Sequence, residues 1–563
     1  MKRIKFISSI ALCAFALASC SGMLDLHNPN YFTEEEMNEY LKENPSADES
    51  IISGLCAGLY GYITVANAAT NGGYSNTGMY ESYKDFSHLC QTGDIVEGAV
   101  GNAGTFSKWY QNLASNTYWE RTNEVDCYGY YYSAVLKVQP AQKALDYLPA
   151  SKVAERPELA QYRAQALTLK ALAYIQLMER FTDLDAETIV SETKQGWPVY
   201  EEYIYSEPKE PLSCKATWAW INRQLEEADS LFSVSSLGNK GYTVYGTTKN
   251  ANDLFDIDRG VCQYYRCRAA LDSRDWNTVI KAGNELLAQY PDFIAAEDYG
   301  MPASVLPTVQ RTGVTADKPF GTGWAGEFPA NKNGLISNEL NPETLFGNGD
   351  KSSSTQFWSV LGLNPLKHGP SGYYQMDQKL YDSMSDADCR KACVLSEDFD
   401  GLVVYSKAEK DTTFSTYTMP KYTSLKWGAT CGLDQTNHSI ENTFANSCWL
   451  RKSAVLLMVA EAYAQSGNTT GAKSLLNQLL AARTLPGYSA MTCSTGSLEE
   501  VQTQWRIEMW GEGDWAFYNC KRWGHKSFDR GSNHWSTATI PTSGWTWEVP
   551  EKQERQGNPY WNN

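Results

Sequence analysis

The two stretches of sequence that decide the fold are helical hairpins that lie 193 residues apart. Residues 266–290 read RCRAALDSRDWNTVIKAGNELLAQY, and residues 459–483 read VAEAYAQSGNTTGAKSLLNQLLAAR. Each stretch predicts a helix, a short polar turn and a second helix. Identical aligned pairs include Ala269/Ala462, Ser273/Ser466, Leu286/Leu479, Leu287/Leu480 and Ala288/Ala481. Small alanines let helices approach closely, and we expect the leucine pair to face the next unit. This pattern is typical of tetratricopeptide-like repeats, in which the helix pairs are stable only when they stack on one another.

Amphipathic patterns outside these hairpins predict further helices that stack with them. Together with the hairpin helices, the predicted helices are 131–148, 158–180, 214–232, 260–272, 276–290, 449–466, 470–483 and 498–515. Between about 295 and 445 helical periodicity is mostly lost, and Gly, Thr, Ser, Asn and aromatic residues dominate. We therefore predict a mainly α fold: tetratricopeptide-like helix hairpins packed against a large irregular, loop-rich region with short strands.

Composition narrows the class of protein. The 563 residues include 42% apolar side chains, which is normal for a globular chain and excludes a disordered or fibrous one. With 48 Lys and Arg against 65 Asp and Glu, the net charge of −17 argues against a nucleic-acid-binding protein, which would present a basic face. The 18 Trp, 18 Phe and 35 Tyr must fill a core or be presented to a ligand.

The N-terminal residues have the three parts of a bacterial lipoprotein signal. Lys2, Arg3 and Lys5 precede an apolar stretch, Phe6–Leu17, that is too short to span a bilayer, and Leu17-Ala18-Ser19-Cys20 follows. We expect residues 1–19 to be removed and Cys20 to carry the lipid, so that a lipid anchor alone attaches the protein to a membrane.

The remaining boundaries are drawn from composition. Residues 20–45 are predicted to be a lipidated tether and residues 46–563 a single domain. Within that domain the helical scaffold covers about 46–294 and 446–525, the irregular ligand-binding insertion about 295–445, and the C-terminal tail 526–563.

Cysteine and acidic patterns do not predict a metal site or a cofactor. Twelve Cys remain besides Cys13 and Cys20, and none form a C-x2-C pair, so zinc is not expected. Disulfides and buried free thiols both stay open, because spacing does not give connectivity. Glu397–Gly401 is like part of a calcium loop but lacks the downstream Glu, so we expect a solvated loop there, with bound calcium as the less favoured alternative.

Several landmarks occur in order along nearly the whole chain. The most diagnostic is Leu450-Arg451 followed by Leu456-Leu457-Met458-Val459-Ala460-Glu461-Ala462. The others are Ser19–Asp25, the Ala-rich 164–181 helix, Asn341–Phe346, Leu380–Met384 with Asp388–Lys391, Arg506-x-Glu508 with Glu512-Gly513, and Lys521–Gly524. In these landmarks the chain resembles the SusD/RagB family of nutrient-binding outer-membrane lipoproteins. It departs from the family at Thr182, at Asp514–Asn519 and in its final residues.

The resemblance implies four tetratricopeptide helix pairs against a loop-built half. It also implies a location and a partner: a lipid-anchored, surface-exposed protein of the outer membrane that caps a SusC-like TonB-dependent transporter. Implied ligands are oligosaccharides or polysaccharides; RagB-like relatives take peptides, and a peptide or glycopeptide ligand is the alternative.

Exposed aromatic rings suit the apolar face of a sugar, and Asn, Asp, Arg and Gln suit its hydroxyl edge. In the family the ligand face is built by loops, and two stretches fit that placement, residues 71–119 and 321–374. The predicted ligand-binding residues are Trp324, Trp109, Tyr74, Trp358, Tyr373, Tyr374 and Asn112. By contrast, the tryptophans on helical patterns are expected to be structural: Trp218, Trp220, Trp449, Trp505, Trp510, Trp515 and Trp523.

Motifs for catalysis are missing from the sequence. The six His form no H-E-x-x-H motif, and Gly-x-Ser-x-Gly and P-loop patterns do not occur. Acid pairs such as Asp256 and Asp258 are expected by chance among 65 acids, so they do not indicate a glycoside hydrolase. We therefore expect a binding protein rather than an enzyme, with a hydrolase as the less favoured alternative.

Overall fold

The computed structural model describes the chain in separate stretches. These are residues 34–57, 59, 93–94, 96, 137–202, 208–234, 257–304, 310–312, 323–325, 336–337, 341–348, 375–405, 414–426, 446–512, 515–525, 529–534, 546–549 and 559–561. The predicted signal peptide and Cys20 lie outside them. The chain divides into two compact units, residues 1–55 and residues 56–563.

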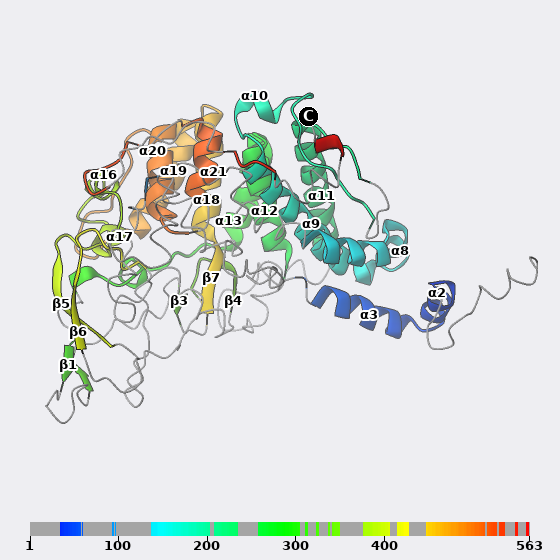
Figure 1. The fold of residues 1–563 in the computed structure, drawn as a ribbon, viewed down its shortest axis with the longest axis horizontal. Coiled ribbons are helices and arrows are strands. Elements are labelled where there is room, and N and C mark those ends of the chain that lie inside the picture. The colour runs from blue at the N-terminus through cyan, green and yellow to red at the C-terminus, as the bar shows by residue number, and fades with distance from the viewer. Residues whose placement is uncertain are drawn as a thin grey trace, which may run out of the picture. The chain divides into compact units, whose positions relative to one another are not determined.

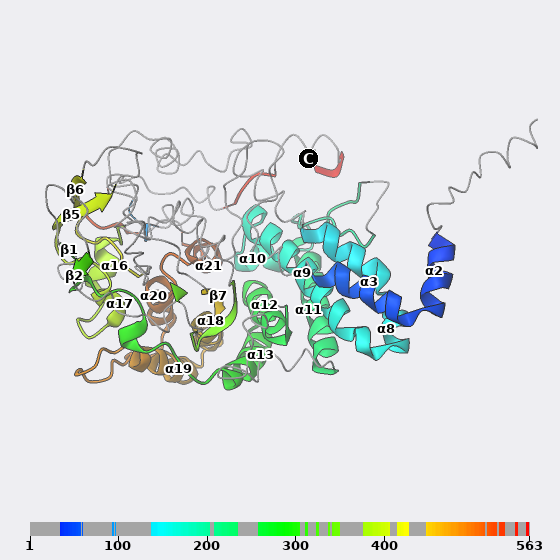
Figure 2. The ribbon, with the colours of Figure 1, turned by 90° about the horizontal axis from the view of Figure 1, so that it is seen from below.

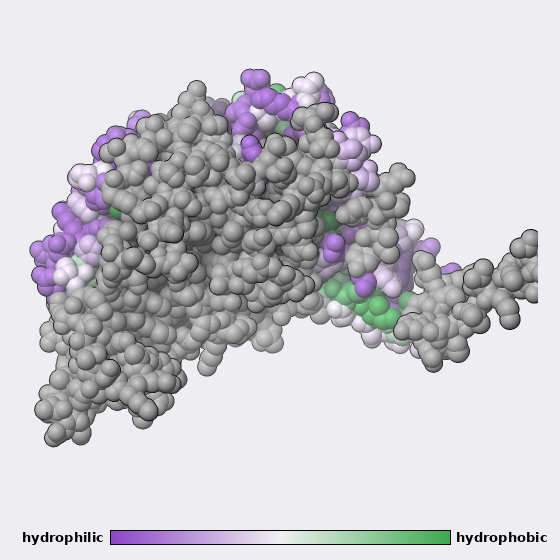
Figure 3. Space-filling view, viewed as in Figure 1, coloured by the Kyte–Doolittle hydropathy of each residue, from purple (hydrophilic) through white to green (hydrophobic). Residues whose placement is uncertain are grey.

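Two helices are described in the first unit. Helix α2 (Glu34–Glu43) falls within the predicted tether, and α3 (Pro45–Ala57) continues into the second unit. Apolar colour gathers over α3 in Figure 3, where Ile51 and Leu55 are half-buried. Asp48 lies in the first turn of α3, where the positive end of the helix dipole stabilises a negatively charged side chain.

The second unit is dominated by helices, which confirms the predicted fold class (Figures 1 and 2). A helical run over 137–147 begins it. The following helices are α8 (Ala150–Glu155), η1 (Pro157–Leu159), α9 (Ala160–Phe181), α10 (Ala186–Ile189), α11 (Cys214–Val234), α12 (Arg259–Asp272), α13 (Trp276–Gln289), η4 (Ala296–Asp298), α16 (Gln378–Asp382), α17 (Cys389–Ala392), α18 (Lys452–Gln465), α19 (Thr469–Ala482), α20 (Leu498–Glu508), α21 (Trp515–Trp523) and η9 (Pro559–Trp561).

The sequence echo corresponds to a repeated structure down to its turn. In both hairpins a serine ends the first helix and its Oγ donates to the carbonyl four residues earlier at 2.7 Å. The next residue has a positive φ, and the one after it caps the second helix with its side-chain oxygen. The equivalent pairs are Ser273/Ser466, Arg274/Gly467 and Asp275/Asn468.

The two hairpins stack directly, as predicted. Helix α13 of the first packs against α18 of the second, while α11 packs against both α9 and α12. Gly283 lies at the α13–α18 contact, where a Cβ would come within 2.2 Å of Val459 Cγ2. A glycine therefore permits the close approach of the repeats.

Two predicted helices are wrong at their ends. Residues 449–451 belong to strand β7 (Asn446–Arg451), and α18 begins only at Lys452, because β7 pairs with two strands of the middle region. Likewise, residues 498–515 do not form one helix, because α20 ends at Glu508. The backbone carbonyl of Glu508 accepts hydrogen bonds from the side chains of Tyr299, Lys426 and Arg451, and not from the backbone amide of a further helical turn. In both places long-range contacts override the local pattern.

The described strands of the middle region are short and antiparallel. Strands β1 (Gln310–Thr312) and β2 (Gly323–Ala325) form one pair, and β5 (Phe399–Tyr405) and β6 (Phe414–Met419) another. Strands β3 (Ile336–Ser337) and β4 (Thr344–Asn348) flank β7. The short helices α16 and α17 lie between β4 and β5 in the chain. Asp398 and Asp400 are exposed as expected, but Asp400 lies in β5 rather than in a loop and accepts from Thr418 Oγ1.

Helical tryptophans and cysteines fill the core. Trp218, Trp220, Trp505, Trp510 and Trp515 are buried, which confirms their structural assignment. The structure describes nine of the cysteines outside the signal segment, and all nine are free thiols. Eight of these are buried, so the thiol alternative holds for this part of the chain. They behave as small apolar side chains; burial raises the pKa of Cys267, for example, to about 12.

Candidate functional site

Of the seven predicted ligand-binding residues, the structure describes one. Trp324 is the central residue of β2, and its backbone pairs with Arg311 of β1. Both views place this ribbon beside β5 and β6 (Figures 1 and 2). Trp109, Tyr74, Trp358, Tyr373, Tyr374 and Asn112 lie outside the described residues.

A buried charge cluster joins the middle region to the helical scaffold. Its members are four cations, Arg390, Lys426, Arg451 and Arg483, and four carboxylates, Glu343, Asp388, Glu508 and Glu512. All eight are at most 6% exposed. The formal charges cancel, which burial at this depth requires.

Glu508 at the end of α20 is the centre of the cluster. Its Oε1 accepts from Arg451 Nη1 at 2.6 Å and Arg483 Nη2 at 2.8 Å, and its Oε2 accepts from Arg390 Nη1 at 3.0 Å. Glu343, next to β4, bridges the same two arginines, Arg483 at 2.6 Å and Arg451 at 3.0 Å. Because these residues come from α17, β7, α19, α20 and the approach to β4, the cluster fixes the strands of the middle region to the helices.

The other end of the cluster is held by Glu512. It accepts from Arg451 through both carboxylate oxygens, at 2.5 and 2.7 Å, and from Lys426 Nζ at 2.6 Å. Lys426 also donates to the backbone carbonyls of Glu508 and Trp510, so its three protons are all used.

Electrostatics in the cluster keep Glu508 and Glu343 ionised. Burial alone would raise the pKa of Glu508, but Arg483, Arg451 and Arg390 outweigh it and hold that pKa well below its usual value. The same balance of burial against Arg483 and Arg451 lowers the pKa of Glu343. Among the cations, burial lowers the pKa of Lys426 to about 8 against the pull of Glu512. The cluster therefore positions the middle region by charge.

A second buried cluster ties the C-terminal helix α21 to the scaffold. Arg522 donates to Glu461 of α18 at 2.8 and 2.9 Å and to Asp272 of α12 at 2.8 Å. Arg268 of α12 forms a two-pronged pair with Glu179 of α9 at 2.5 Å. Helices that are far apart in sequence are thus joined by buried ion pairs.

Lys521 beside this cluster gives the protein a predictable pH dependence. Its Nζ donates to the carbonyls of Glu179 and Thr182, both at 2.6 Å, and burial lowers its pKa to about 7 against the pull of nearby carboxylates. Between that value and its unfolded pKa of about 10.4, the unfolded chain binds more protons, so this residue makes stability rise with pH.

Replacing Lys521 should make the stability of the protein rise less steeply with pH in this range. Urea midpoints from about pH 6 to about pH 10 should rise more steeply for the wild type than for Lys521→Met. The exposed Lys379→Met is the matched control and should follow the wild type. Parallel profiles for wild type and Lys521→Met would contradict the assignment.

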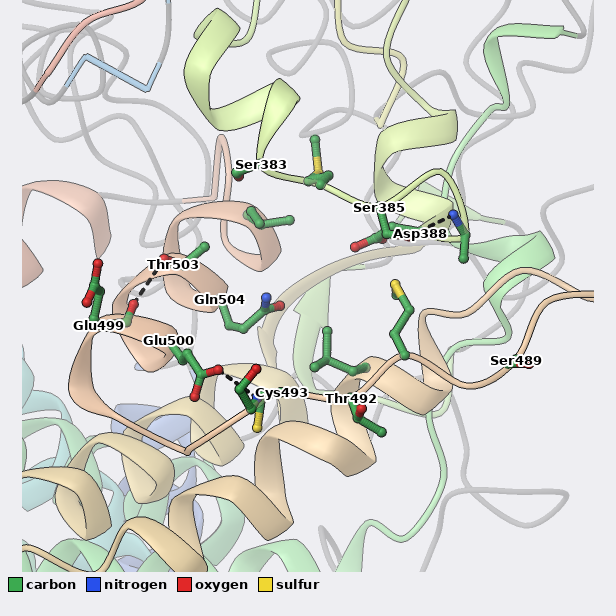
Figure 4. Close-up of a pocket in the computed structure, with 16 residues that line it drawn as sticks. Ser383, Ser385, Asp388, Ser489, Thr492, Cys493, Glu499, Glu500, Thr503 and Gln504 are labelled. Carbon is green, nitrogen blue, oxygen red and sulfur yellow. Dashed lines mark hydrogen bonds between the residues drawn. The ribbon is translucent and has the colours of Figure 1, made fainter.

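The described residues also enclose a pocket of about 590 Å³ between the α16–α17 connection, the loop after α19, and α20 (Figure 4). Polar side chains on its wall are Asp388, Thr492, Glu500, Thr503 and Gln504. Its volume falls within the range of about 300–1,000 Å³ of small-molecule sites. Among the residues described, its wall contains no aromatic side chain, so it is not the predicted stacking platform.

Sequence reasoning found some of these residues and missed others. Arg451, Glu508, Glu512 and Arg522 lie in the quoted landmarks, but nothing in their spacing showed that they form buried ion pairs. The pocket was not predicted, since its loop, residues 489–494, carries only scattered hydroxyl and sulfur side chains. No described helix combines the length and apolar character that a membrane span needs. Within the same residues, no group of three or more His, Cys, Asp or Glu side chains could hold a metal ion.

Known proteins share the fold of this chain. Residues 373–562 match the family model described as "SusD family". A SusD-like carbohydrate binding protein from Bacteroides vulgatus is 16% identical and shares the fold with a TM-score of 0.58, over 91% of this chain and 96% of that one. A SusD superfamily protein from Bacteroides thetaiotaomicron is 14% identical, with a TM-score of 0.59 over 90% of this chain and 98% of that one.

One similar structure contains a ligand. Surface glycan-binding protein A from Bacteroides thetaiotaomicron, in complex with laminarihexaose, is 14% identical with a TM-score of 0.56, covering 91% of this chain and 98% of that one. No curated protein matches the sequence. The C-terminal third of the chain thus matches the SusD family model, and the chain shares the SusD-like fold over nine tenths of its length.

Proposed function

We propose that this protein is a cell-surface lipoprotein, anchored in the outer membrane through Cys20, that captures oligosaccharide or polysaccharide. It delivers the glycan to a SusC-like TonB-dependent transporter and does not act on it chemically. The observation that carries the proposal is the SusD family match of residues 373–562, together with the fold shared with a glycan-binding protein that holds laminarihexaose.

The architecture suits this role. The charge cluster holds the bases of β4 and β7 and the segments around Arg390 and Lys426 on the helical scaffold. Binding surfaces on loops held by a rigid scaffold are common in proteins. Trp324 on the β1–β2 ribbon supplies the kind of ring that stacks on a sugar face.

Ring removal tests the binding site. Trp324→Ala and Trp109→Ala are each expected to weaken binding of laminarihexaose or another bound glycan by at least about tenfold in titration calorimetry. Trp324→Tyr, which keeps a ring, should retain most of the affinity, and circular dichroism should show unchanged folding for all three. Unchanged affinity in both alanine variants would reject this site.

A second measurement separates binding from catalysis. The purified protein should retain polysaccharide on an affinity gel without changing its chain length. Release of reducing ends that grows with protein concentration would instead favour a glycoside hydrolase.

A further inference from the structure

The pocket between the α16–α17 connection and α20 has the features of a small-ligand site separate from the aromatic stretches. One wall comes from residues 383–388, another from α20, and a third from the loop after α19 (Figure 4). Its apolar surface is contributed by Met384, Leu480, Met491 and Ile507. Six hydroxyl side chains share the lining with these apolar groups.

Several polar groups on this wall are available to a ligand. Three exposed residues at the rim carry hydroxyls with no hydrogen-bond partner among the described residues: Ser489, Thr492 and Ser494. Each hydroxyl can both donate and accept, as the hydroxyls of a polyol can.

The orientation of Gln504 is fixed by the charge cluster. Arg390 Nη2 donates to Gln504 Oε1 at 2.9 Å, and a guanidinium cannot accept, so the oxygen of this amide faces Arg390. The Nε2 group then remains as a donor with no partner in the described chain, on a side chain that lines the pocket. The same guanidinium holds Asp388, which forms part of the pocket wall, at 2.7 Å.

Charge on the wall selects against anions. Its sixteen residues include the carboxylates Asp388, Glu499 and Glu500 and no Lys, Arg or His. Asp388 is neutralised by Arg390, and Glu500 accepts from the backbone amides of Ser494, Thr495 and Gly496. Glu499, exposed at the start of α20, has no cation near it on this wall. Among the lining residues an acidic sugar would meet carboxylates and no cation. The cations that contact this wall include Arg390, which donates to Asp388 and Gln504, and Lys473, which donates to the Ser494 carbonyl.

We propose that this pocket binds an uncharged, polyhydroxylated small molecule of mono- or disaccharide size, at a site distinct from the Trp324 region. Gln504 donates to a ligand oxygen, the rim hydroxyls of Ser489 and Thr492 match its hydroxyl groups, and the Met384–Met491 surface covers its C–H face. The inference does not depend on the proposed function, because it rests on the lining of this pocket alone.

The test uses the Trp324→Ala protein, so that binding at the aromatic region does not contribute. Saturation-transfer NMR with glucose, cellobiose and glucuronate, each at about 5 mM, should show binding of at least one neutral sugar and weaker binding of the acid. Thr492→Trp, which fills the pocket from its exposed rim, and the milder double variant Ser489→Ala/Thr492→Val should each reduce the signal by about tenfold.

The outcomes separate the two sites. Loss of sugar binding in the rim variants, with polysaccharide retention unchanged when Trp324 is intact, supports the pocket even if the proposed glycan function fails. Absence of binding to both neutral sugars, equal binding of glucuronate and glucose, or binding that persists in Thr492→Trp would each overturn the proposal.

Discussion

Replacing Glu508 with alanine is expected to lower the free energy of unfolding by about 3–5 kcal/mol, measured by urea denaturation. The side chain is fully buried and accepts from Arg390, Arg451 and Arg483, so its removal leaves an excess buried positive charge among these three guanidinium groups. An uncompensated buried charge is far more costly than the loss of one ordinary hydrogen bond.

Two variants show whether charge or shape causes this loss. Glu508→Gln keeps the size of the side chain but removes its charge, and it should retain most of the penalty. Glu499→Ala lies on the same helix, is exposed and stands outside the cluster, so it should change stability by at most about 1 kcal/mol. A loss below about 1 kcal/mol for Glu508→Ala would show that the cluster does not hold the middle region.

The second large effect is expected at Gly283. Gly283→Leu should destabilise the protein by about 3 kcal/mol, because its Cβ alone would lie 2.2 Å from Val459 Cγ2 on the neighbouring hairpin. Valine is stiff at χ1, so the contact is relieved only by moving α13 and α18 apart.

Ala288→Leu is the matched control for this substitution. It adds the same side chain to the exposed face of the same helix, and stability should change by at most about 0.5 kcal/mol. Adding Val459→Ala to Gly283→Leu should recover more than about 1 kcal/mol relative to additivity, which a double-mutant cycle measures. Additive effects would mean that the repeats do not meet at these two residues.

Local sequence was sufficient to predict most helices. The pattern in 266–290 and 459–483 predicted the ends of both hairpins to within about one residue, except at the start of α18, because caps and apolar spacing act between neighbours along the chain. The same reasoning failed at Trp449–Arg451 and beyond Glu508. There the chain leaves the helical pattern to pair with β3 and β4 or to offer its carbonyls to Lys426 and Arg451.

The sequence could predict which kinds of residue contact a ligand, but not which individual residues do so. Trp324 is placed on the short strand β2, but a ring-rich stretch without periodicity gives no register from which to predict which rings share a surface. The pocket beside α20 has no sequence signature, since its walls come from three segments of the chain and its ligand-facing donor, Gln504, is oriented by Arg390 more than a hundred residues away.

By itself the sequence determined that this protein is a stack of helical hairpins with an irregular middle region, because periodicity and capping are properties of adjacent residues. Only the tertiary structure decided how the two halves are joined. Glu343, Arg390, Arg451, Arg483 and Glu508 are separated along the chain by 25 to 140 residues at their paired contacts, and they become partners only when folding buries them together. Coulomb attraction is strong enough to hold these segments only in the low dielectric that burial creates.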